Sequence, residues 1–392
     1  MRFNLWEDCN RVPLTELLSF IVDNRGKTVP TAPSGHKLIA TNCVTNNTLF
    51  PVYDKIRYLS EETYQTWFRA HPIPGDILFV NKGTPGRVCL VPDPVDFCIA
   101  QDMIALRADE SKIYPKYLFT VLRRREIQQQ IYNTNVGDVI PHFKKQFLDQ
   151  LLIPIPERSI QESIGDLYYV LSLKAERNKK INDNLADLLQ TIYQGRFGND
   201  ILAVNQGVLS DICSYSTDKV AVSELNVRTY FSTENMLSGK AGSTEATSLP
   251  TTSQTTACHK GDTLISNIRP YFKKIVYCED KCGCSTDVLC FTPSQPCYSA
   301  YLFSTLYADK FFAFMVAGSK GTKMPRGDKQ QIMTYPVVLP SEEELAGFNT
   351  IASPLLEQIY SNRAENKRLS ILRDTLLPKL MSGEINVSAI QL

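Results

Sequence analysis

The sequence lacks any apolar run close to the roughly 20 residues that a bilayer-spanning helix needs. Its N-terminal stretch also lacks the long apolar segment of an export signal, so we expect a cytoplasmic protein. Disorder is not indicated, because 43% of the 392 residues are hydrophobic and 21% are charged. That composition is ordinary for a globular chain with two or three cores.

The sequence also lacks a basic excess. Its 42 Lys and Arg residues face 41 Asp and Glu residues, which leaves a formal net charge of +1. Domains that hold nucleic acid through bulk electrostatics usually carry a marked positive charge. The balance therefore argues against a protein that binds nucleic acid alone in this way, although a charged partner could make up the deficit.

Histidine is scarce, and no catalytic triad has support. The four histidines are His36, His71, His142 and His259, and none lies near a Ser or Cys in a nucleophile motif. Packed or solvated imidazoles are the better interpretation of each. We therefore predict no catalytic residues for a triad-type enzyme.

A looser enzyme pattern is formed by Asp93, Glu110 and Lys112. They match the Pro-Asp, Glu-x-Lys arrangement of metal-dependent nucleases, in which the carboxylates hold Mg²⁺ and the lysine assists attack on phosphate. The pattern is short and has no counterpart later in the chain. A surface turn is favoured, and a standalone Mg-dependent nuclease is kept as the alternative.

Eleven cysteines, an odd number at irregular spacing, favour reduced thiols. The densest group raises a zinc hypothesis, because thiolate and imidazole are the ligands of structural zinc. It comprises Cys258, His259, Cys278, Cys282, Cys284 and Cys290. No pair of C-x2-C knuckles is present, and the first half of the chain has nothing comparable. The sequence therefore favours buried thiols in strands and predicts no metal.

An internal duplication is the most informative feature that is present. Residues 114–156 return without a gap as residues 298–340, and after four extra residues 178–181 return as 366–369. A period this long indicates a domain duplication and not a stacked solenoid. The earlier parts of the two copies agree less well. A shared frame with divergent loops suits a bipartite target.

Each copy is expected to begin with a mixed α+β module of about 150 residues. The strands expected in the first copy are 76–80, 88–91 and 103–106, and those in the second are 263–265 and 288–291. An amphipathic helix is expected over 115–132, and a matching one over 301–316.

Each copy is expected to end in one long helix with a heptad pattern. The expected seam positions are Ile164, Leu171, Asn178, Ile181, Leu185 and Leu188 in the first helix, and Asn366, Leu369, Leu376 and Leu380 in the second. Helices of about 36 residues extend about 54 Å, more than a module of this size covers. We therefore expect an antiparallel coiled coil in which Asn178 and Asn366 fix the register. Pro354 and Pro378 are expected to kink the second helix.

Several strings, duplicated and in this order, resemble the specificity subunits of type I restriction-modification systems. They are the closing segment 372–385, the segment 153–156 followed by Gln161 and Ile164, and the segment 261–274. The resemblance covers essentially the whole chain. One departure is Leu345, where Gln161 would predict glutamine; we do not expect it to alter the fold.

The resemblance implies an α+β fold with two pseudo-symmetric globular target recognition domains joined by two long antiparallel coiled-coil helices. Each domain would read one half of an asymmetric DNA site, and the helices would space the halves and dock two methyltransferase subunits. The chain itself would be non-catalytic and hold no cofactor. S-adenosylmethionine would lie in the methyltransferase partners, and ATP-dependent restriction subunits would join the complex. A structural protein that merely assembles partners is a further rival.

The expected boundaries follow the duplication. They are a first recognition domain at 1–156, a spacer helix at 157–197, a second recognition domain at 198–340, a second spacer helix at 341–385 and a tail at 386–392.

Basic residues in turns are the expected DNA contacts, because Lys and Arg neutralise phosphates while side chains reach base edges. Two pairs of turns recur at equivalent positions of the two copies, which favours this reading over a merely solvated face. The candidates are Lys82 and Arg87 in 81–87, Arg269, Lys273 and Lys274 in 267–274, Lys144 and Lys145 in 135–145, and Lys320, Lys323 and Arg326 in 318–326. The arginine run 123–125 is a weaker candidate.

Overall fold

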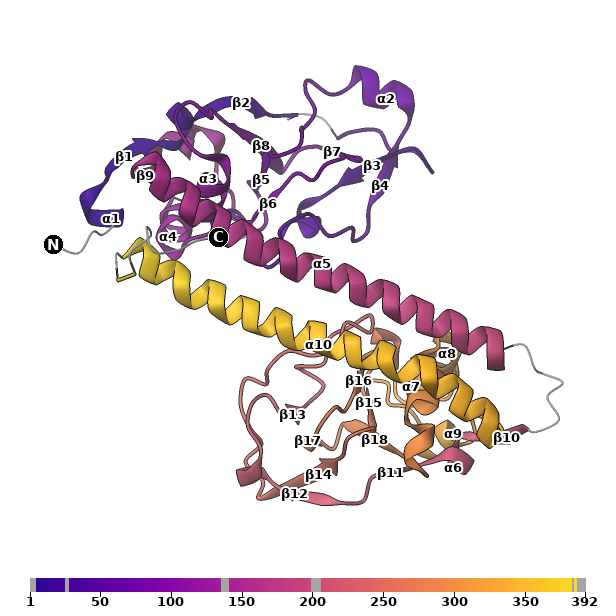
Figure 1. Ribbon diagram of the computed structural model, residues 1–392. Helices are drawn as coiled ribbons and strands as arrows, with labels where there is room; N and C mark the ends of the chain where they lie inside the picture. The colour runs from indigo at the N-terminus through magenta and orange to yellow at the C-terminus, as the bar shows by residue number, and fades with distance from the viewer. Residues whose placement is uncertain (1–4, 25–27, 135–140, 199–205, 383, 386–392) are drawn as a thin grey trace. The chain divides into compact units, whose positions relative to one another are not determined.

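The chain divides into two units, each with its own α+β part. The computed structural model describes residues 5–24, 28–134, 141–198, 206–382 and 384–385 (Figure 1). The first unit contains residues 1–179 and 364–392, and the second contains residues 180–363. Two 40-residue helices, α5 (Arg158–Phe197) and α10 (Glu342–Met381), contribute to both units. Among the described residues, no helix is long and apolar enough to span a membrane.

The first unit is built on two small sheets. Its elements are α1 (Leu5–Asp8), β1 (Asn10–Pro13), η1 (Leu14–Leu17), β2 (Leu18–Val22), β3 (His36–Ile39), η2 (Thr41–Cys43), β4 (Arg57–Leu59), α2 (Glu61–Thr66), β5 (Ile77–Val80), β6 (Val88–Leu90), β7 (Phe97–Ile99), β8 (Met103–Ala108), α3 (Pro115–Leu122), α4 (Arg125–Asn133), η3 (Lys145–Gln150) and β9 (Leu152–Ile155). One sheet has the order β2-β8-β5-β6, the other has the order β4-β3-β7, and β1 pairs with β9.

The second unit repeats this plan. Its elements are β10 (Gln206–Val208), α6 (Leu209–Ile212), β11 (Cys213–Tyr215), β12 (Lys219–Ala221), η4 (Val222–Glu224), β13 (Tyr230–Phe231), β14 (Gln254–Cys258), β15 (Thr263–Ser266), η5 (Pro270–Phe272), β16 (Ile275–Tyr277), β17 (Cys282–Cys284), β18 (Val288–Pro293), η6 (Pro296–Tyr298), α7 (Ser299–Tyr307), α8 (Asp309–Ala317), α9 (Lys329–Met333) and β19 (Pro336–Val338). The sheets have the orders β11-β18-β15-β16 and β12-β14-β17-β13, and β10 pairs with β19.

The central strands are buried on both faces, which explains their continuous apolar runs. In β5, Ile77 and Phe79 belong to one core while Leu78 and Val80 belong to another. This follows from the two-residue period of a strand. The strands expected from the sequence in both copies are therefore confirmed.

The duplication is visible in equivalent contacts. The Tyr117 hydroxyl donates to the carbonyl oxygen of Pro154 at 2.7 Å, and the Tyr301 hydroxyl donates to that of Val338 at 2.6 Å. Both residues of each pair are 184 positions apart from their counterparts. In each unit this bond ties a buried helix to the last strand of the module.

The departure at Leu345 is accommodated by a local change. In the first unit the Gln161 side chain accepts a hydrogen bond from the Tyr114 amide at 2.9 Å. In the second unit the equivalent Tyr298 amide bonds to the carbonyl of Gln295 at 3.0 Å, within the turn that contains η6. The second unit therefore needs no side-chain acceptor at position 345, and the apolar Leu345 lies in the core of that unit.

The single amphipathic helix expected over 115–132 is wrong, because two helices, α3 and α4, occupy this region. Arg124 has an extended backbone (φ −71°, ψ 147°), and the Arg123 guanidinium turns inward and donates to the carbonyl of Val88 at 2.8 Å. The second copy breaks in the same way between α7 and α8, at Ala308.

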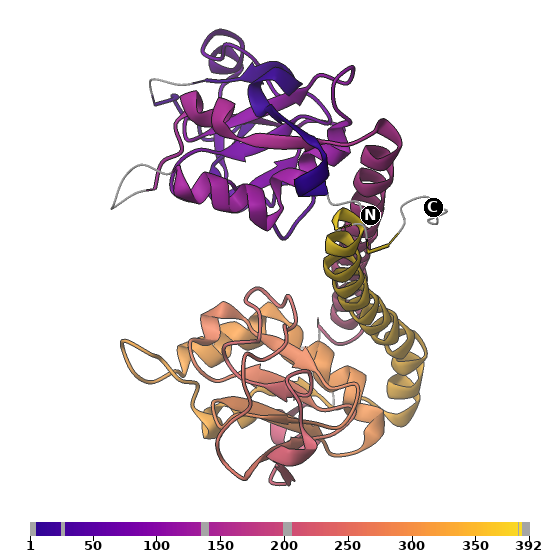
Figure 2. The same ribbon diagram turned by 90° about the vertical axis from the view of Figure 1, so that its left-hand side faces the viewer.

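Within each unit, α5 and α10 lie side by side and antiparallel, as expected (Figures 1 and 2). In the first unit the Asn178 side-chain amide donates to Asn366 Oδ1 at 2.9 Å. In the second unit Asn362 donates to Asn182 Oδ1 at 2.8 Å. Partner numbers that rise on one helix fall on the other, which is the signature of an antiparallel pair. Polar layers of this kind fix register in coiled coils.

The expected seam is wrong at two positions of α5. Ile181 and Leu188 are 45% and 46% exposed, whereas Asn182 and Leu189 are buried. An ideal helix drifts by about 20° per heptad, so a seam that is read at strict heptad spacing moves off the contact line. Of the other expected positions, some are buried and some half-buried: Ile164, Asn178 and Leu380 are buried, and Leu171, Leu185, Asn366, Leu369 and Leu376 are half-buried.

Candidate nucleic-acid interface

In the first unit, the turn after β5 pairs with the segment before η3. The Gly83 amide donates to the carbonyl of Pro141 at 3.0 Å, and the Phe143 amide donates to that of Asn81 at 2.8 Å. The Asn81 side chain adds a bond to the Phe143 carbonyl at 3.3 Å. Two candidate turns that are about 60 residues apart in the sequence therefore form one surface.

The second unit makes the same two backbone bonds. The Arg269 amide donates to the carbonyl of Pro325 at 2.8 Å, and the Gly327 amide donates to that of Asn267 at 3.2 Å. These four residues are the counterparts of those in the first unit. We call residues 81–87 with 141–145 the first loop pair, and residues 267–274 with 318–327 the second loop pair.

The candidates in the first loop pair differ in their surroundings. Lys82, Arg87 and Lys144 are exposed. Lys145 instead forms an ion pair with Asp23 at 3.0 Å, and the Asp23 side chain is only 7% exposed. Lys145 thus serves an internal contact. Residues 135–140 of the expected candidate segment lie outside the described residues.

Beside the second loop pair, Asp309 forms ion pairs with the ammonium groups of two lysines. Lys240 and Lys273 lie 2.7 and 2.9 Å from its Oδ1 atom. Their hydrogen bonds, that of Lys240 first, lower the pKa of Asp309 to about 2. Lys274 is half-buried and donates to the carbonyl of Thr233 at 2.5 Å, and burial lowers its pKa. Lys273 and Lys274 are therefore engaged with the protein.

The hairpin of the second loop pair carries two further ion pairs and one exposed lysine. Lys320 lies 2.5 Å from Asp328, and its hydrogen bond contributes most to lowering the pKa of that carboxyl. Arg326 lies 3.0 Å from Asp287. Lys323 at the tip of the hairpin is exposed. A phosphate could therefore reach the ammonium group of Lys323 more readily than that of Lys320, which is already paired.

Two exposed aromatic residues in the second loop pair were not among the DNA contacts expected from the sequence. Tyr271 and Phe272 are 50% and 39% exposed and lie between Arg269 and Lys273. Both basic residues have φ of 50°, so left-handed residues bracket the η5 turn and push the rings outward. The adjacent Tyr-Phe pair in a basic turn was the available signal.

The nuclease alternative gains no geometric support. Lys112 donates to the carbonyl of Glu16 at 3.0 Å and lies 3.3 Å from Asp109. Within the part of the chain that the structure describes, the one group of three or more potential metal ligands consists of cysteines and does not contain Asp93 or Glu110. The structure thus does not bring the proposed nuclease residues together as a metal site.

Comparison with known proteins agrees with this architecture. A family model described as "Type I restriction modification DNA specificity domain" matches residues 19–187. Residues 19–187 of this chain are thus similar to that domain. It is 34% identical over 73 residues to the specificity subunit of the type I restriction enzyme MjaIX from Methanocaldococcus jannaschii, which is 19% of this chain and 17% of the relative.

A second relative and a solved structure extend the comparison. The chain is 43% identical over 49 residues to the specificity subunit of the HindI enzyme from Haemophilus influenzae, 12% of this chain and 11% of that protein. The matches thus span less than a fifth of either curated relative. The crystal structure of a type I restriction-modification S subunit from M. genitalium has a TM-score of 0.59, with 18% identity, over 95% of this chain and 96% of that chain. This likeness shows that the chain shares the fold of that structure.

Proposed function

We propose that this chain is the DNA-specificity subunit of a type I restriction-modification complex, in which each unit reads one half of an asymmetric bipartite site. The observation that carries this is the pair of equivalent loop surfaces, joined by the same two backbone hydrogen bonds in both units. The backbones of the two loop surfaces are joined in the same way, while their side chains differ. Two different readers on one frame would recognise two different half-sites.

The loop pairs supply both kinds of contact that DNA recognition needs. Lys82, Arg87 and Lys144 in the first pair and Lys323 in the second are exposed and would neutralise phosphates. Polar and aromatic groups beside them, such as Tyr271, can reach base edges or sugars. Because the net charge is only +1, partner subunits would supply much of the attraction to DNA.

The long helices carry exposed apolar positions that suit partner docking. On α5 these are Val170, Ile181 and Leu188, and on α10 they are Ile351, Ile371 and Leu372, all between 38% and 49% exposed. A helix face that leaves several apolar side chains exposed would suit contact with a partner protein. We propose that two methyltransferase subunits dock here, and that ATP-dependent restriction subunits join through them.

In this proposal the chain is non-catalytic. S-adenosylmethionine and the methyl-transfer chemistry belong to the docked subunits, and DNA cleavage belongs to the restriction subunits. The recognition domains would be 1–156 and 198–340, with spacer helices at 157–197 and 341–385 and a tail at 386–392. The proposed place of action is the cytoplasm.

The direct test is to express the chain with its methyltransferase subunits and to map methylated adenines across the host DNA. We expect one asymmetric two-part motif. Replacing residues 206–340 with the same region of another family member should change one half of the motif and leave the other unchanged. Methylation without a fixed motif, or a change in both halves, would contradict the proposal.

Two controls separate the rivals. The purified chain incubated with DNA and Mg²⁺ should not cut, and cutting that disappears in Asp93→Ala would support the nuclease instead. Exchanging residues 1–150 should abolish binding at the original site while leaving subunit assembly intact. Unchanged site-specific binding after that exchange would favour a purely structural role.

A further inference from the structure

Five cysteines gather in one small core of the second unit. The nine buried residues of this core are Met236, Cys258, Leu264, Val276, Cys278, Cys282, Cys284, Val288 and Cys290. They come from or adjoin strands of both sheets of the unit, so the core lies between the sheets. All five cysteines are buried and none is in a disulfide.

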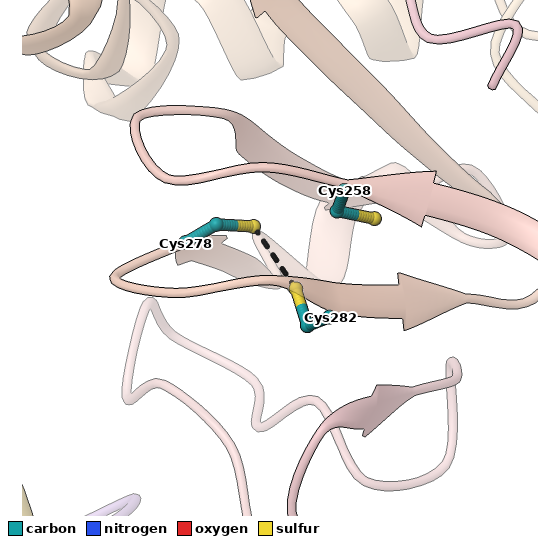
Figure 3. A group of neighbouring side chains, drawn as sticks. All are labelled: Cys258, Cys278 and Cys282. Carbon is teal, nitrogen blue, oxygen red and sulfur yellow. Dashed lines mark hydrogen bonds between the residues drawn. The ribbon is translucent and has the colours of Figure 1, made fainter. Parts of the chain in front are cut away.

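The strand register brings the sulfur atoms together. Cys258 on β14 lies directly opposite Cys282 on β17, and Cys284 follows two residues later, so all three share one face of the sheet. Cys278 directly follows β16. The Sγ atoms of Cys258, Cys278 and Cys282 lie within 4.8 Å of one another, and Cys282 Sγ is 3.4 Å from Cys278 Sγ (Figure 3).

The equivalent core of the first unit is made mainly of hydrocarbon side chains. Its buried members include Val80, Phe97 and Ile99, with only Cys43 and Cys89 as cysteines among its twelve residues. Ala105 pairs with Leu78 there, as Cys290 pairs with Leu264 in the second unit. The fold does not require thiols in this layer, which points to a separate role for them in the second unit.

We propose that this cluster binds one structural Zn²⁺ through the thiolates of Cys258, Cys278, Cys282 and Cys284. Tetrahedral zinc with Zn–S bonds of about 2.3 Å places sulfur atoms about 3.8 Å apart. For Cys258, Cys278 and Cys282, the observed 3.4 Å separation and the 4.8 Å limit bracket that spacing. Binding replaces four S–H protons by one Zn²⁺, and the protons pass to solvent.

We assign Cys284 as the fourth ligand because it shares a strand face with Cys282, while Cys290 is already engaged. The Cys284 sulfur is not in the group of three that lie within 4.8 Å of one another, so its side chain would turn toward the metal on binding. The Cys290 thiol donates to Asp262 Oδ2 at 3.3 Å, and Asp262 is 1% exposed. A thiolate at Cys290 would lie against that buried carboxylate and be repelled. Cys284 Sγ makes a long contact of 3.8 Å to the carbonyl of Val288, and among the described residues no carboxylate holds it in a hydrogen bond.

Zinc in this position would cross-link the two sheets of the second unit. It would join β14 and β17 of one sheet to the end of β16 of the other, and its closed, buried ligand set suits a structural site. The sequence pattern did not favour zinc because it has no C-x2-C pairs. The ligands come instead from strand pairing, which brings residue 258 beside residue 282. The inference does not depend on DNA recognition.

The test is the metal content of the purified full-length chain, produced in zinc-supplemented medium and measured by mass spectrometry of the metal. We expect about one zinc per chain. The zinc content of the Cys282→Ser variant should fall to less than about a tenth of that value. Changing a residue that only supports a ligand typically lowers metal affinity about tenfold or more, and removing a ligand should lower it further. Cobalt in place of zinc should give the charge-transfer absorption of thiolate ligands.

Cys290→Ser is the matched control, since it alters a cysteine of the same core that is not a proposed ligand. It should keep its zinc, whereas Cys284→Ser should lose it. Circular dichroism checks that the variants fold, and chelation of the wild-type chain should lower its melting temperature without any mutation. Zinc-free wild-type chain from that medium, or a Cys278–Cys282 disulfide found by thiol labelling under denaturing conditions, would overturn the proposal.

Discussion

At the scale of single residues, the basic side chains of the loop pairs fall into two groups. Lys145, Lys273 and Arg326 are held by carboxylates of the protein. Lys323 and Lys82 are exposed. A lysine that already has a partner must give it up to meet a phosphate, so equal charges in the sequence do not imply equal contributions to DNA binding.

Lys323→Ala should weaken DNA binding more than Lys274→Ala. Loss of one phosphate contact should lower the slope of log K against log salt concentration by about 0.9. Lys274 points to the Thr233 carbonyl, so its removal should leave the slope nearly unchanged and cost folding stability instead. Binding titrations at several salt concentrations, with the assembled complex, measure both slopes. A larger slope change for Lys274→Ala would reverse this assignment.

Asp309→Asn should strengthen DNA binding. The folded-state pKa of Asp309 is lowered to about 2, so the carboxylate stays charged from about pH 4 upward and holds Lys273 throughout that range. The stabilisation from this pairing is lost only as the pH falls through that value. Freeing Lys273 should raise the salt slope by up to about 0.9. The double variant Asp309→Asn, Lys273→Ala should return to the wild-type slope or below; a gain that persists without Lys273 would exclude this cause.

The sequence supplied the positions of the basic turns but not their partners. Asp309, Asp287 and Asp23 are 36, 39 and 122 residues from the lysines and arginine that they hold. Such pairings depend on the tertiary fold, which residue type and local spacing do not encode. The recurrence of the basic turns in the two copies was a stronger guide to their position than residue type, because equivalent residues of the two units lie in equivalent places.

At the scale of elements, buried asparagines line the contact between α5 and α10. Asn182 and Asn362 are bonded to each other, and the Asn182 amide also donates to the carbonyl of Ile359 at 3.2 Å. Both side chains are buried. A slip of the helices would leave these amides without partners in an apolar setting, so the layer selects one register.

Asn182→Ala should destabilise the second unit by about 1–3 kcal/mol, because it leaves the buried Asn362 amide without its acceptor. Asn184→Ala is the matched control, since residue 184 is on the same helix but exposed. Urea denaturation of the full chain, followed by far-UV circular dichroism, measures the free energy of unfolding for each. Equal losses in the two variants would show that the hydrogen bond is not the cause.

The elements themselves were largely predictable, and the misses have local causes. Apolar runs located the central strands, and heptad spacing located both long helices. The pattern could not reveal the break at Arg124, because residues on either side of it face the same core. Pro354 and Pro378 both lie within α10, Glu342–Met381, so neither proline ends the helix; the expected kinks stay a prediction.

At the scale of the whole molecule, α5 and α10 are each shared by both units. The boundary between the units falls after Lys179 on one helix and after Arg363 on the other. The helices pair on both sides of this boundary, through Asn178 with Asn366 and Asn182 with Asn362. Helices that contribute to both units in this way would suit a molecular spacer.

If the helices act as this spacer, inserting seven residues after Lys179 and seven after Arg363 should lengthen the unread gap of the DNA site. Seven helical residues add about 10.5 Å, and base pairs are about 3.4 Å apart, so the gap should grow by up to about three base pairs. A heptad restores the contact face on both sides of the insertion. Mapping methylated adenines should show two unchanged half-sites with a longer gap between them. The control is a seven-residue insertion in α5 alone, because it shifts α5 against α10 and breaks the pairing of the two helices. Altered half-sites with an unaltered gap would refute the spacer role.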